Sequence, residues 1–308
     1  MEFNARIKVI GVGGSGDNVV SRMAKCSPKG VELIAINADV QDLQKTRAHT
    51  RIRVGRELTK GLGTGMNPEI GRLAVEEQRE EIERALSGAD MVFITCGLGG
   101  GCGSGGSVVV ADIARNLGML TFAVVTTPFS FEGLQRAQIA QECLSKLKTK
   151  VDSLITISND KLLSTLEPKI TVTEAFWFCD ETLRQAVQAI SDLIVLPGIV
   201  SISFADIKTV MKDSGSAIFG IGKAKGPERA KQAARQALNS PLLDVSYRGA
   251  KGILFNISGQ DVSLNEIDEA AKIITQEVSS GAKIVFGAVQ DEELKKGEIK
   301  VTVIATGF

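Results

Sequence analysis

A run of glycines between two strongly patterned segments constrains the fold of this chain most. The sequence Gly-Leu-Gly-Gly-Gly-Cys-Gly-Ser-Gly-Gly at 97–106 follows the apolar segment 91–95, which predicts a buried strand, and precedes 107–114, which predicts a helix. Glycines let successive backbone N–H groups point at one anion, and no Cβ blocks its approach. Because the helix N-terminus adds unpaired donors and partial positive charge, the arrangement favours a phosphate site over a flexible linker.

A second glycine loop lies near the N-terminus. The predicted strand 7–10 is followed by Gly-Val-Gly-Gly-Ser-Gly at 11–16, which fits G-x-G-x-x-G, and then by a predicted helix. The next predicted strand, 33–37, ends near Asp39, where a dinucleotide-binding fold places its ribose acid. By itself this motif predicts an NAD-dependent oxidoreductase. Together, the two loops predict two backbone phosphate clamps on neighbouring strands, without a P-loop lysine.

Composition narrows the function further. The 308 residues suffice for two moderate domains, and 36 acidic against 36 basic residues argue against a nucleic-acid-binding or membrane-adsorbing surface. No apolar stretch is long enough to insert into a membrane. The single histidine, His49, excludes a His-based triad or multi-histidine metal site, so we assign no metal ligands. Five scattered cysteines and no signal peptide predict a cytoplasmic protein with reduced thiols.

The order of elements predicts an α/β fold. The first half alternates strands and helices, as expected for a Rossmann-like parallel sheet with ligands at the carboxyl ends of its strands. Beyond the segments above, its predicted elements are a loop at 61–68, helices at 68–86 and 133–148, and strands at 121–126 and 153–157. A long helix then begins at a capping box of Thr171 and Glu174 and ends at Pro197.

The last third predicts a smaller α+β domain. Its predicted elements are a helix at 230–238, another from 263, and strands at 252–257, 283–289 and 298–305.

An aromatic ring and a carboxylate four residues apart predict recognition of guanine. Phe176 and Asp180 share a helix face, so the ring can stack on the base while the acid accepts hydrogen bonds from N1–H and the exocyclic amine. Adenine offers no such donor pair. Without the glycine loops, a core phenylalanine and a solvated acid would be favoured. After the strand ending at Thr126, Glu132 is a candidate ligand for ribose hydroxyls and Arg136 for phosphate oxygens.

These residues add up to a family resemblance. The chain resembles FtsZ, the prokaryotic tubulin-like family of division GTPases, over essentially all of its length. The segments that carry the resemblance are 10–14, 35–37, 55–59, 88–93, 128–133, 159–160, 204–206 and 286–289.

The resemblance implies a tubulin/FtsZ-like fold with a GTP-binding domain at 1–170, a central connecting helix at 171–197 and a C-terminal domain at 198–308. It also implies GTP or GDP as ligand, with Mg²⁺ beside the phosphates. Copies of the chain would join head to tail into protofilaments, in which a catalytic loop at 198–206 completes the GTP site of the neighbouring subunit.

The glycine loops and the resemblance together assign the nucleotide-binding residues. The last five residues of the set match, by position, family residues that contact ribose, phosphate or guanine. The full set is Gly13, Gly14, Ser15, Asn18, Gly99, Gly100, Gly101, Cys102, Gly103, Ser104, Gly105, Glu132, Arg136, Asn159, Phe176 and Asp180.

The catalytic loop departs from the family pattern Asn-x-Asp-Phe-Ala-Asp. Here Ser201 and Ser203 replace the asparagine and the first aspartate, while Asp206 remains. A serine hydroxyl is no base near neutrality, and hydrolysis needs a group that orients the attacking water. We therefore expect slow or absent hydrolysis. Two versions stay open: a GTPase whose hydrolysis limits filament lifetime, and a paralogue that assembles but turns over slowly.

Two further departures lie in the glycine loops. Cys102 replaces the family's threonine with a weaker donor, while Ser104 keeps a hydroxyl, so binding should weaken modestly. Cys102 is also a candidate reactive thiol, although bound phosphate would oppose its ionisation. Asp17 stands where the family has small or neutral residues, and would either repel phosphate or face solvent. Adaptor binding stays open, because nothing after Phe308 could act as the tail through which relatives recruit membrane adaptors.

Overall fold

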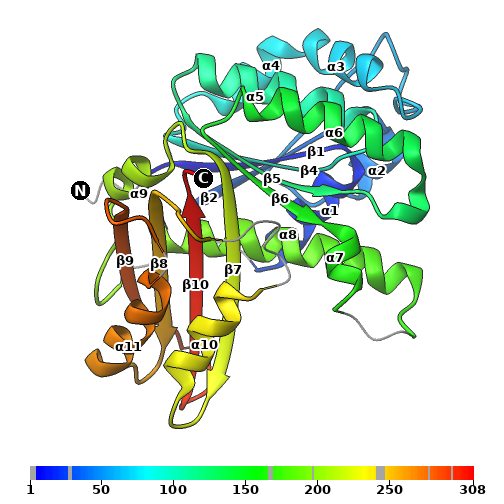
Figure 1. The fold of residues 1–308 in the computed structure, drawn as a ribbon. Helices are drawn as coiled ribbons and strands as arrows, with labels where there is room; N and C mark the ends of the chain where they lie inside the picture. Colours follow the sequence, from blue (N-terminus) through cyan, green and yellow to red (C-terminus); the bar gives the residue numbers. More distant parts are fainter. Residues whose placement is uncertain are drawn as a thin grey trace. The chain divides into compact units, whose positions relative to one another are not determined.

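The computed structural model describes residues 5–26, 30–165, 169–195, 198–240, 247–276, 278–292 and 294–308. Contacts divide the chain into two compact units, Met1–Ser191 and Asp192–Phe308. The first contains a parallel sheet covered by helices, and the second contains a smaller mixed sheet (Figure 1). The finer division into segments 1–170, 171–197 and 198–308 stays a prediction.

The sheet of the first unit is parallel, as predicted. Its strand order is β3-β2-β1-β4-β5-β6, and each neighbouring pair runs in the same direction. Because helices cover both faces, the strands are buried on both sides and read as nearly continuous apolar runs. The strands are β1 (Ile7–Val12), β2 (Val31–Asn37), β3 (Thr50–Arg53), β4 (Met91–Gly97), β5 (Leu120–Thr127) and β6 (Ser153–Ser158).

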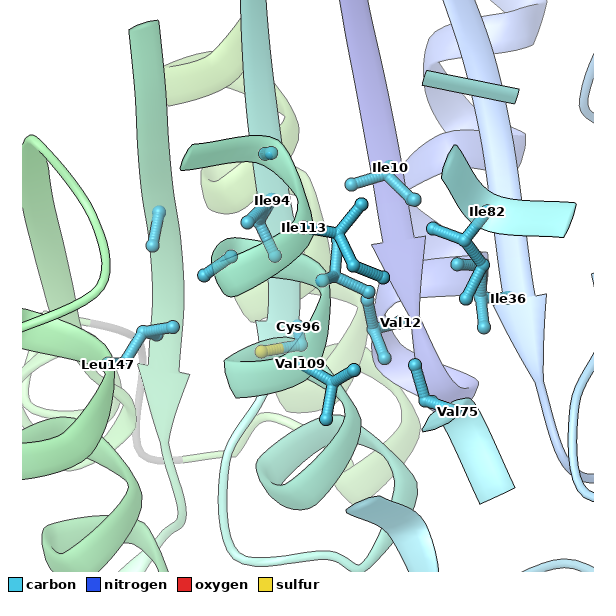
Figure 2. Close-up of a cluster of buried hydrophobic side chains, with 14 of the residues drawn as sticks. Ile10, Val12, Ile36, Val75, Ile82, Ile94, Cys96, Val109, Ile113 and Leu147 are labelled. Atoms are coloured by element: carbon cyan, nitrogen blue, oxygen red, sulfur yellow. The ribbon is translucent and has the colours of Figure 1, made fainter. Parts of the chain in front are cut away.

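Helices on the two faces of this sheet build its core. The helix α1 (Gly13–Cys26) packs on β1, β2 and β4. On the opposite face, α5 (Ser107–Asn116) and α6 (Leu134–Lys148) contribute to a large apolar cluster. Figure 2 shows Ile10 and Val12 of β1 beside Val109 and Ile113 of α5 within that cluster. This packing holds the strand ends, and therefore the loops that follow them, in fixed positions.

The single helix predicted over 68–86 is wrong. The structure has α3 (Pro68–Glu77) and α4 (Arg79–Leu86), separated at Gln78, whose backbone is not helical. The Gln78 side chain accepts a hydrogen bond of 2.7 Å from the Gly55 backbone N–H. This long-range contact has no signal in a helical sequence pattern, and it fixes the residue where the chain leaves the helix.

The long helix is confirmed as α8 (Val172–Val195). Its predicted capping box is present, because Glu174 accepts from the Thr171 backbone N–H at 2.8 Å and Thr171 Oγ1 accepts from the Glu174 N–H at 3.2 Å. Pro197, predicted to end the helix, lies outside the described residues. Among the helices that the structure describes, none is both long and apolar enough to span a bilayer.

In the second unit the strand order is β7-β10-β8-β9, with β10 antiparallel to β7 and β8. A Cβ at Gly220 or Gly222 of β7 would overlap a backbone carbonyl of α10, so glycines let helix and strand approach closely. Because glycine is uncommon within strands, these residues explain why the sequence analysis did not predict β7. The elements are α9 (Phe204–Met211), β7 (Gly215–Lys225), α10 (Arg229–Leu238), β8 (Gly252–Gly259), α11 (Leu264–Thr275), β9 (Lys283–Gln290) and β10 (Glu298–Thr306).

Candidate nucleotide site

A cleft of about 620 Å³ opens at the carboxyl ends of β1, β4 and β5 in the first unit. This is where a parallel sheet flanked by helices places its ligands. Gly99, Ser104 and Gly105 do not line the cleft. The predicted nucleotide-binding residues that do line it are Gly13, Gly14, Ser15, Asn18, Gly100, Gly101, Cys102, Gly103, Glu132, Arg136, Asn159, Phe176 and Asp180.

The two glycine loops meet at the floor of the cleft. Gly13 has a φ of +73°, and a Cβ there would lie 3.0 Å from the backbone nitrogen of Gly103. A Cβ at Gly103 would in turn lie 2.6 Å from the carbonyl oxygen of Gly97. The contact between the loops therefore leaves no space for side chains, and the wall here is backbone.

The glycine loop at 97–106 enters its helix through an unusual turn. Residues Cys102–Gly106 form a π-helical turn, η1, immediately before α5. The sequence analysis placed the helix start at Ser107. Such wide turns are rare, and those that occur are frequently at functional sites. The turn continues the helix toward the cleft, so that unpaired N–H groups lie at its edge.

Ser104 holds the loop instead of facing the cleft. Its buried Oγ accepts a hydrogen bond of 3.0 Å from the Gly99 backbone N–H, and its carbonyl accepts from the Cys143 thiol at 3.0 Å. At Gly105 a Cβ would overlap the carbonyl oxygen of Pro68 on α3. Ser104 and Gly105 therefore fix the conformation of the loop without lining the cleft.

Asp180 joins α8 to α1 at the other end of the cleft. Its carboxylate accepts hydrogen bonds from Ser15 Oγ at 3.1 Å and Asn18 Nδ2 at 3.0 Å, and the Arg22 guanidinium lies 3.9 Å away. Burial raises the pKa of Asp180 to about 6, against the lowering influence of these three partners. These fixed donors therefore orient the Asp180 carboxylate.

Phe176 presents a partly open ring one helical turn before Asp180. It is 39% exposed and lies edge-on to Phe129, with ring centroids 5.2 Å apart. Phe129 stacks on Phe131 at 4.9 Å. In this contact the edge of one ring meets the face of the other. Aromatic surface therefore remains at the cleft wall, where a planar ligand can stack.

Glu132 and Arg136 form an ion pair at the cleft wall, with Arg136 Nη1 2.8 Å from Glu132 Oε2. Glu132 Oε1 accepts from the Phe129 backbone N–H at 2.9 Å. Their predicted roles toward ribose and phosphate stay predictions. Asn159, at the start of α7 (Asn159–Leu163), is buried, and its Oδ1 has no hydrogen-bond partner among the described residues. A buried, unpaired amide oxygen in a cleft wall calls for a ligand donor.

Part of the cleft was missed by the sequence analysis, which singled out only Asp39 here, as the ribose acid of a dinucleotide-binding fold. Asn37, Asp39 and Asp42 line it, together with the loop 62–66. Asp39 caps the short helix α2 (Val40–Lys45), where its carboxylate accepts from the N–H groups of residues 41 and 42. The alternating Gly61, Gly63 and Gly65, each with positive φ, were a sequence signal for a shaped loop.

Asp17 does not face solvent, which excludes one of the two alternatives that the sequence left open for it. It is only 2% exposed, and its Oδ2 accepts a hydrogen bond of 2.7 Å from Asn37 Nδ2. Burial raises its pKa to about 8. Burial likewise raises the pKa of the Cys102 thiol to about 12, so the structure gives no support to a reactive thiol there.

The three predicted catalytic residues belong to the second unit and do not line this cleft. Ser203 caps α9, and Asp206 closes a capping box by accepting from the Ser203 backbone N–H at 3.0 Å and from its Oγ at 2.5 Å. These bonds lower the pKa of Asp206. Ser201 Oγ donates to the Gly198 carbonyl at 3.2 Å. All three are exposed.

Comparison with known proteins agrees with this geometry. Residues 6–167 match the model of the Tubulin/FtsZ family GTPase domain, and residues 215–308 match that of the FtsZ family C-terminal domain. The chain is 49% identical over 306 residues to "Cell division protein FtsZ 1" of Thermococcus kodakarensis, covering 99% of this chain and 82% of the relative. It is 49% identical over 307 residues to the protein of the same name from Pyrococcus horikoshii, with 100% and 82% covered.

A solved structure, "FtsZ dimer, empty (M. jannaschii)", superposes with a TM-score of 0.95 at 42% identity, covering 100% of this chain and 89% of that one. The oxidoreductase alternative is therefore wrong, since the glycine loop on which it rested lies inside the matched GTPase domain. From its first glycine loop to its last strand, the chain belongs to the FtsZ family and carries that family's GTPase domain.

Proposed function

We propose that the cleft binds GTP and GDP, with the triphosphate on the two glycine loops and guanine between Phe176 and Asp180. The observation that carries this proposal is the contact of Gly13 with Gly103 at one end of a cleft whose other end holds the oriented Asp180 carboxylate. Backbone N–H groups suit the phosphates, and a carboxylate suits the N1–H and amino group of guanine.

Mg²⁺ is part of this proposal. The described cleft lining carries the carboxylates of Asp39, Asp42, Glu132 and Asp180 against the single guanidinium of Arg136. A triphosphate placed there needs further positive charge, and Mg²⁺ bound with nucleotides takes most of its ligands from phosphate oxygens and water. When bound, the ion would neutralise charge that develops on the transferring phosphoryl group. GTP affinity should therefore drop when EDTA removes Mg²⁺.

We further propose that copies of the chain assemble head to tail and hydrolyse GTP slowly where two subunits meet, in a role in cell division. Two observations support slow turnover. Ser203 offers no carboxylate, and the carboxylate of Asp206 is engaged in the cap of α9. A cytoplasmic location agrees with the free thiols of Cys26, Cys96, Cys102, Cys143 and Cys179.

The test combines binding with sedimentation. Nucleotide-stripped protein should take up GTP and GDP but not ATP or NAD when titrated in a calorimeter. Pelleting with GTP and with a non-hydrolysable analogue should give similar sediment, GDP should give less, and phosphate release measured in parallel should be low. No uptake of either guanine nucleotide at millimolar concentration overturns the binding proposal. Uptake without sediment overturns only the assembly proposal.

A further inference from the structure

We infer that Asp17, buried directly behind the nucleotide cleft, is a positioning residue of that cleft which favours nucleotide as a neutral acid and opposes it as a carboxylate. The inference rests on the proposed function and assigns one more residue to it. Asp17 itself does not line the cleft, but Asn37, Asp39, Asp42 and Cys102 around it do.

The first step is the orientation of Asn37. Its Oδ1 accepts a hydrogen bond of 3.0 Å from the Asp39 backbone N–H, which leaves its Nδ2 to face Asp17. Asp17 Oδ2 accepts from that Nδ2 at 2.7 Å. Because an amide group has one acceptor end and one donor end, the acceptor on Asp17 and the donor on Asp39 together fix a single amide orientation. Asp17 therefore sets which face Asn37 presents to the cleft.

The second step connects Asn37 to the glycine loop at 61–65. Asp39 forms an isolated antiparallel bridge with Leu62, the Val40 N–H donates to the Gly61 carbonyl at 3.2 Å, and the Gly63 N–H donates to the Ala38 carbonyl at 3.3 Å. These contacts attach the segment that follows Asn37 to the loop at 61–65, which forms one wall of the cleft. Two hydrogen bonds link Asp17 to this wall: Asn37 Nδ2 donates to Asp17, and the Asp39 N–H donates to Asn37 Oδ1.

The third step is the charge of Asp17. Its Oδ1 is buried and has no hydrogen-bond partner, and no ion pair with a lysine, arginine or histidine is formed by Asp17 in the part of the chain that the structure describes. An ionised oxygen without partner in such a place is unfavourable. Its pKa is raised to about 8: desolvation is the largest cause, the Asp42 and Asp39 carboxylates also raise it, and the side chains of Asn37 and Thr46 lower it. Near neutral pH the acid is therefore mostly protonated.

The groups around Asp17 add no compensating cation. From α2 and its cap it is faced by the carboxylates of Asp42 and Asp39, from β2 by the Asn37 amide, and from η1 by the Cys102 thiol. Bound phosphates add more negative charge. Binding would then raise the pKa of Asp17 again, so that nucleotide and proton bind together.

The experiment measures GDP affinity from pH 6.5 to 9 for the wild type and for Asp17→Asn, which mimics the neutral acid and keeps an acceptor for Asn37. Wild-type affinity should fall about tenfold between pH 7 and pH 9, as ionisation with a pKa near 8 removes the binding-competent form. Asp17→Asn should bind like the wild type at pH 6.5 and lose less than about twofold by pH 9.

Asp42→Asn is the matched control. It removes an exposed carboxylate that lines the same cleft and faces Asp17 from α2. Because the Asp42 charge raises the pKa of Asp17, the variant should keep a decline in affinity but move it to lower pH, whereas Asp17→Asn should abolish it. Asp17→Ala, which leaves Asn37 Nδ2 without its acceptor, should bind more weakly at every pH.

Calorimetry in buffers of different ionisation enthalpy gives a second readout. At pH 8 the wild type should take up about half a proton per GDP bound, because about half of the Asp17 side chains are then ionised, and Asp17→Asn should take up none. Wild-type and Asp17→Asn profiles that decline in parallel would overturn the inference and leave the proposed function standing. No binding of GDP by the wild type at any pH would overturn both.

Discussion

At the scale of single residues, the environment of Asp180 predicts a pH dependence of nucleotide binding. Asp180 is held by Ser15 and Asn18 in a position where burial raises its pKa to about 6. Its proposed role needs the ionised form, because only a carboxylate accepts two hydrogen bonds without donating one. The donors on α1 thus preserve an ionised acid at neutral pH that burial would otherwise neutralise.

Guanine nucleotide affinity should consequently fall as the pH drops through about 6, where Asp180 becomes protonated. Asp180→Asn should weaken GDP binding at neutral pH and remove the fall in affinity at acidic pH. It should also reduce the ratio of GDP affinity to ADP affinity. Titrations with both nucleotides at pH 5, 6 and 7 check all three results. An unchanged acid decline in the variant would assign the titration to another group.

At the scale of elements, the glycine loop before α5 has two distinct kinds of position. A Cβ at Gly103 would lie 2.6 Å from the Gly97 carbonyl, inside the packed contact between strand end and turn. A Cβ at Gly100 meets nothing within 4 Å, although Gly100 lines the cleft. One glycine is required by the fold of the loop, and the other leaves room for a ligand.

Two alanine variants separate these functions. Gly103→Ala should lower the free energy of unfolding by about 1–3 kcal/mol, because packed backbone must move. Gly100→Ala should leave thermal stability nearly unchanged and weaken GDP binding, because its methyl group lies where phosphate approaches. Thermal melts without ligand and GDP titrations measure the pair. Equal loss of stability in both variants would contradict this division of the loop.

At the scale of the whole molecule, the catalytic loop works only through assembly in the function proposed here. Ser203 and Asp206 lie in the second unit, whereas the cleft is lined by the first. Ser203 is the N-cap of α9, and aspartate is equally favoured at that position. An aspartate at residue 203 can therefore still cap α9, although the hydrogen bond that Ser203 Oγ donates to Asp206 is lost.

Ser203→Asp should raise GTP turnover on the order of 10²-fold in sedimented protein, because it restores a group that can polarise the attacking water. Turnover should stay low at concentrations too dilute for sediment to form. The matched control, Ser203→Ala, removes the cap and adds no carboxylate, so it should not raise phosphate release. Unchanged turnover in Ser203→Asp filaments would show that position 203 does not limit hydrolysis.

Local patterns in the sequence by themselves determined the parallel sheet, the two glycine loops, the capping boxes and the family. Each of these depends on neighbours along the chain or on motifs of fixed spacing, as the contacts of Thr171 with Glu174 illustrate. The predicted site residues on both glycine loops and on α8 mostly reach one cleft for the same reason, since parallel strands end at one edge.

Only the tertiary structure decided the contacts between segments far apart in the sequence. Gln78 ends a helix because it reaches Gly55, and Gly220 and Gly222 occur within a strand because α10 packs closely on them. Asp17 shows the strongest effect, because its burial beside Asn37 turns an acid that the sequence left undecided into a mostly neutral one. Desolvation depends on every segment packed around a group, and no local pattern encodes that sum.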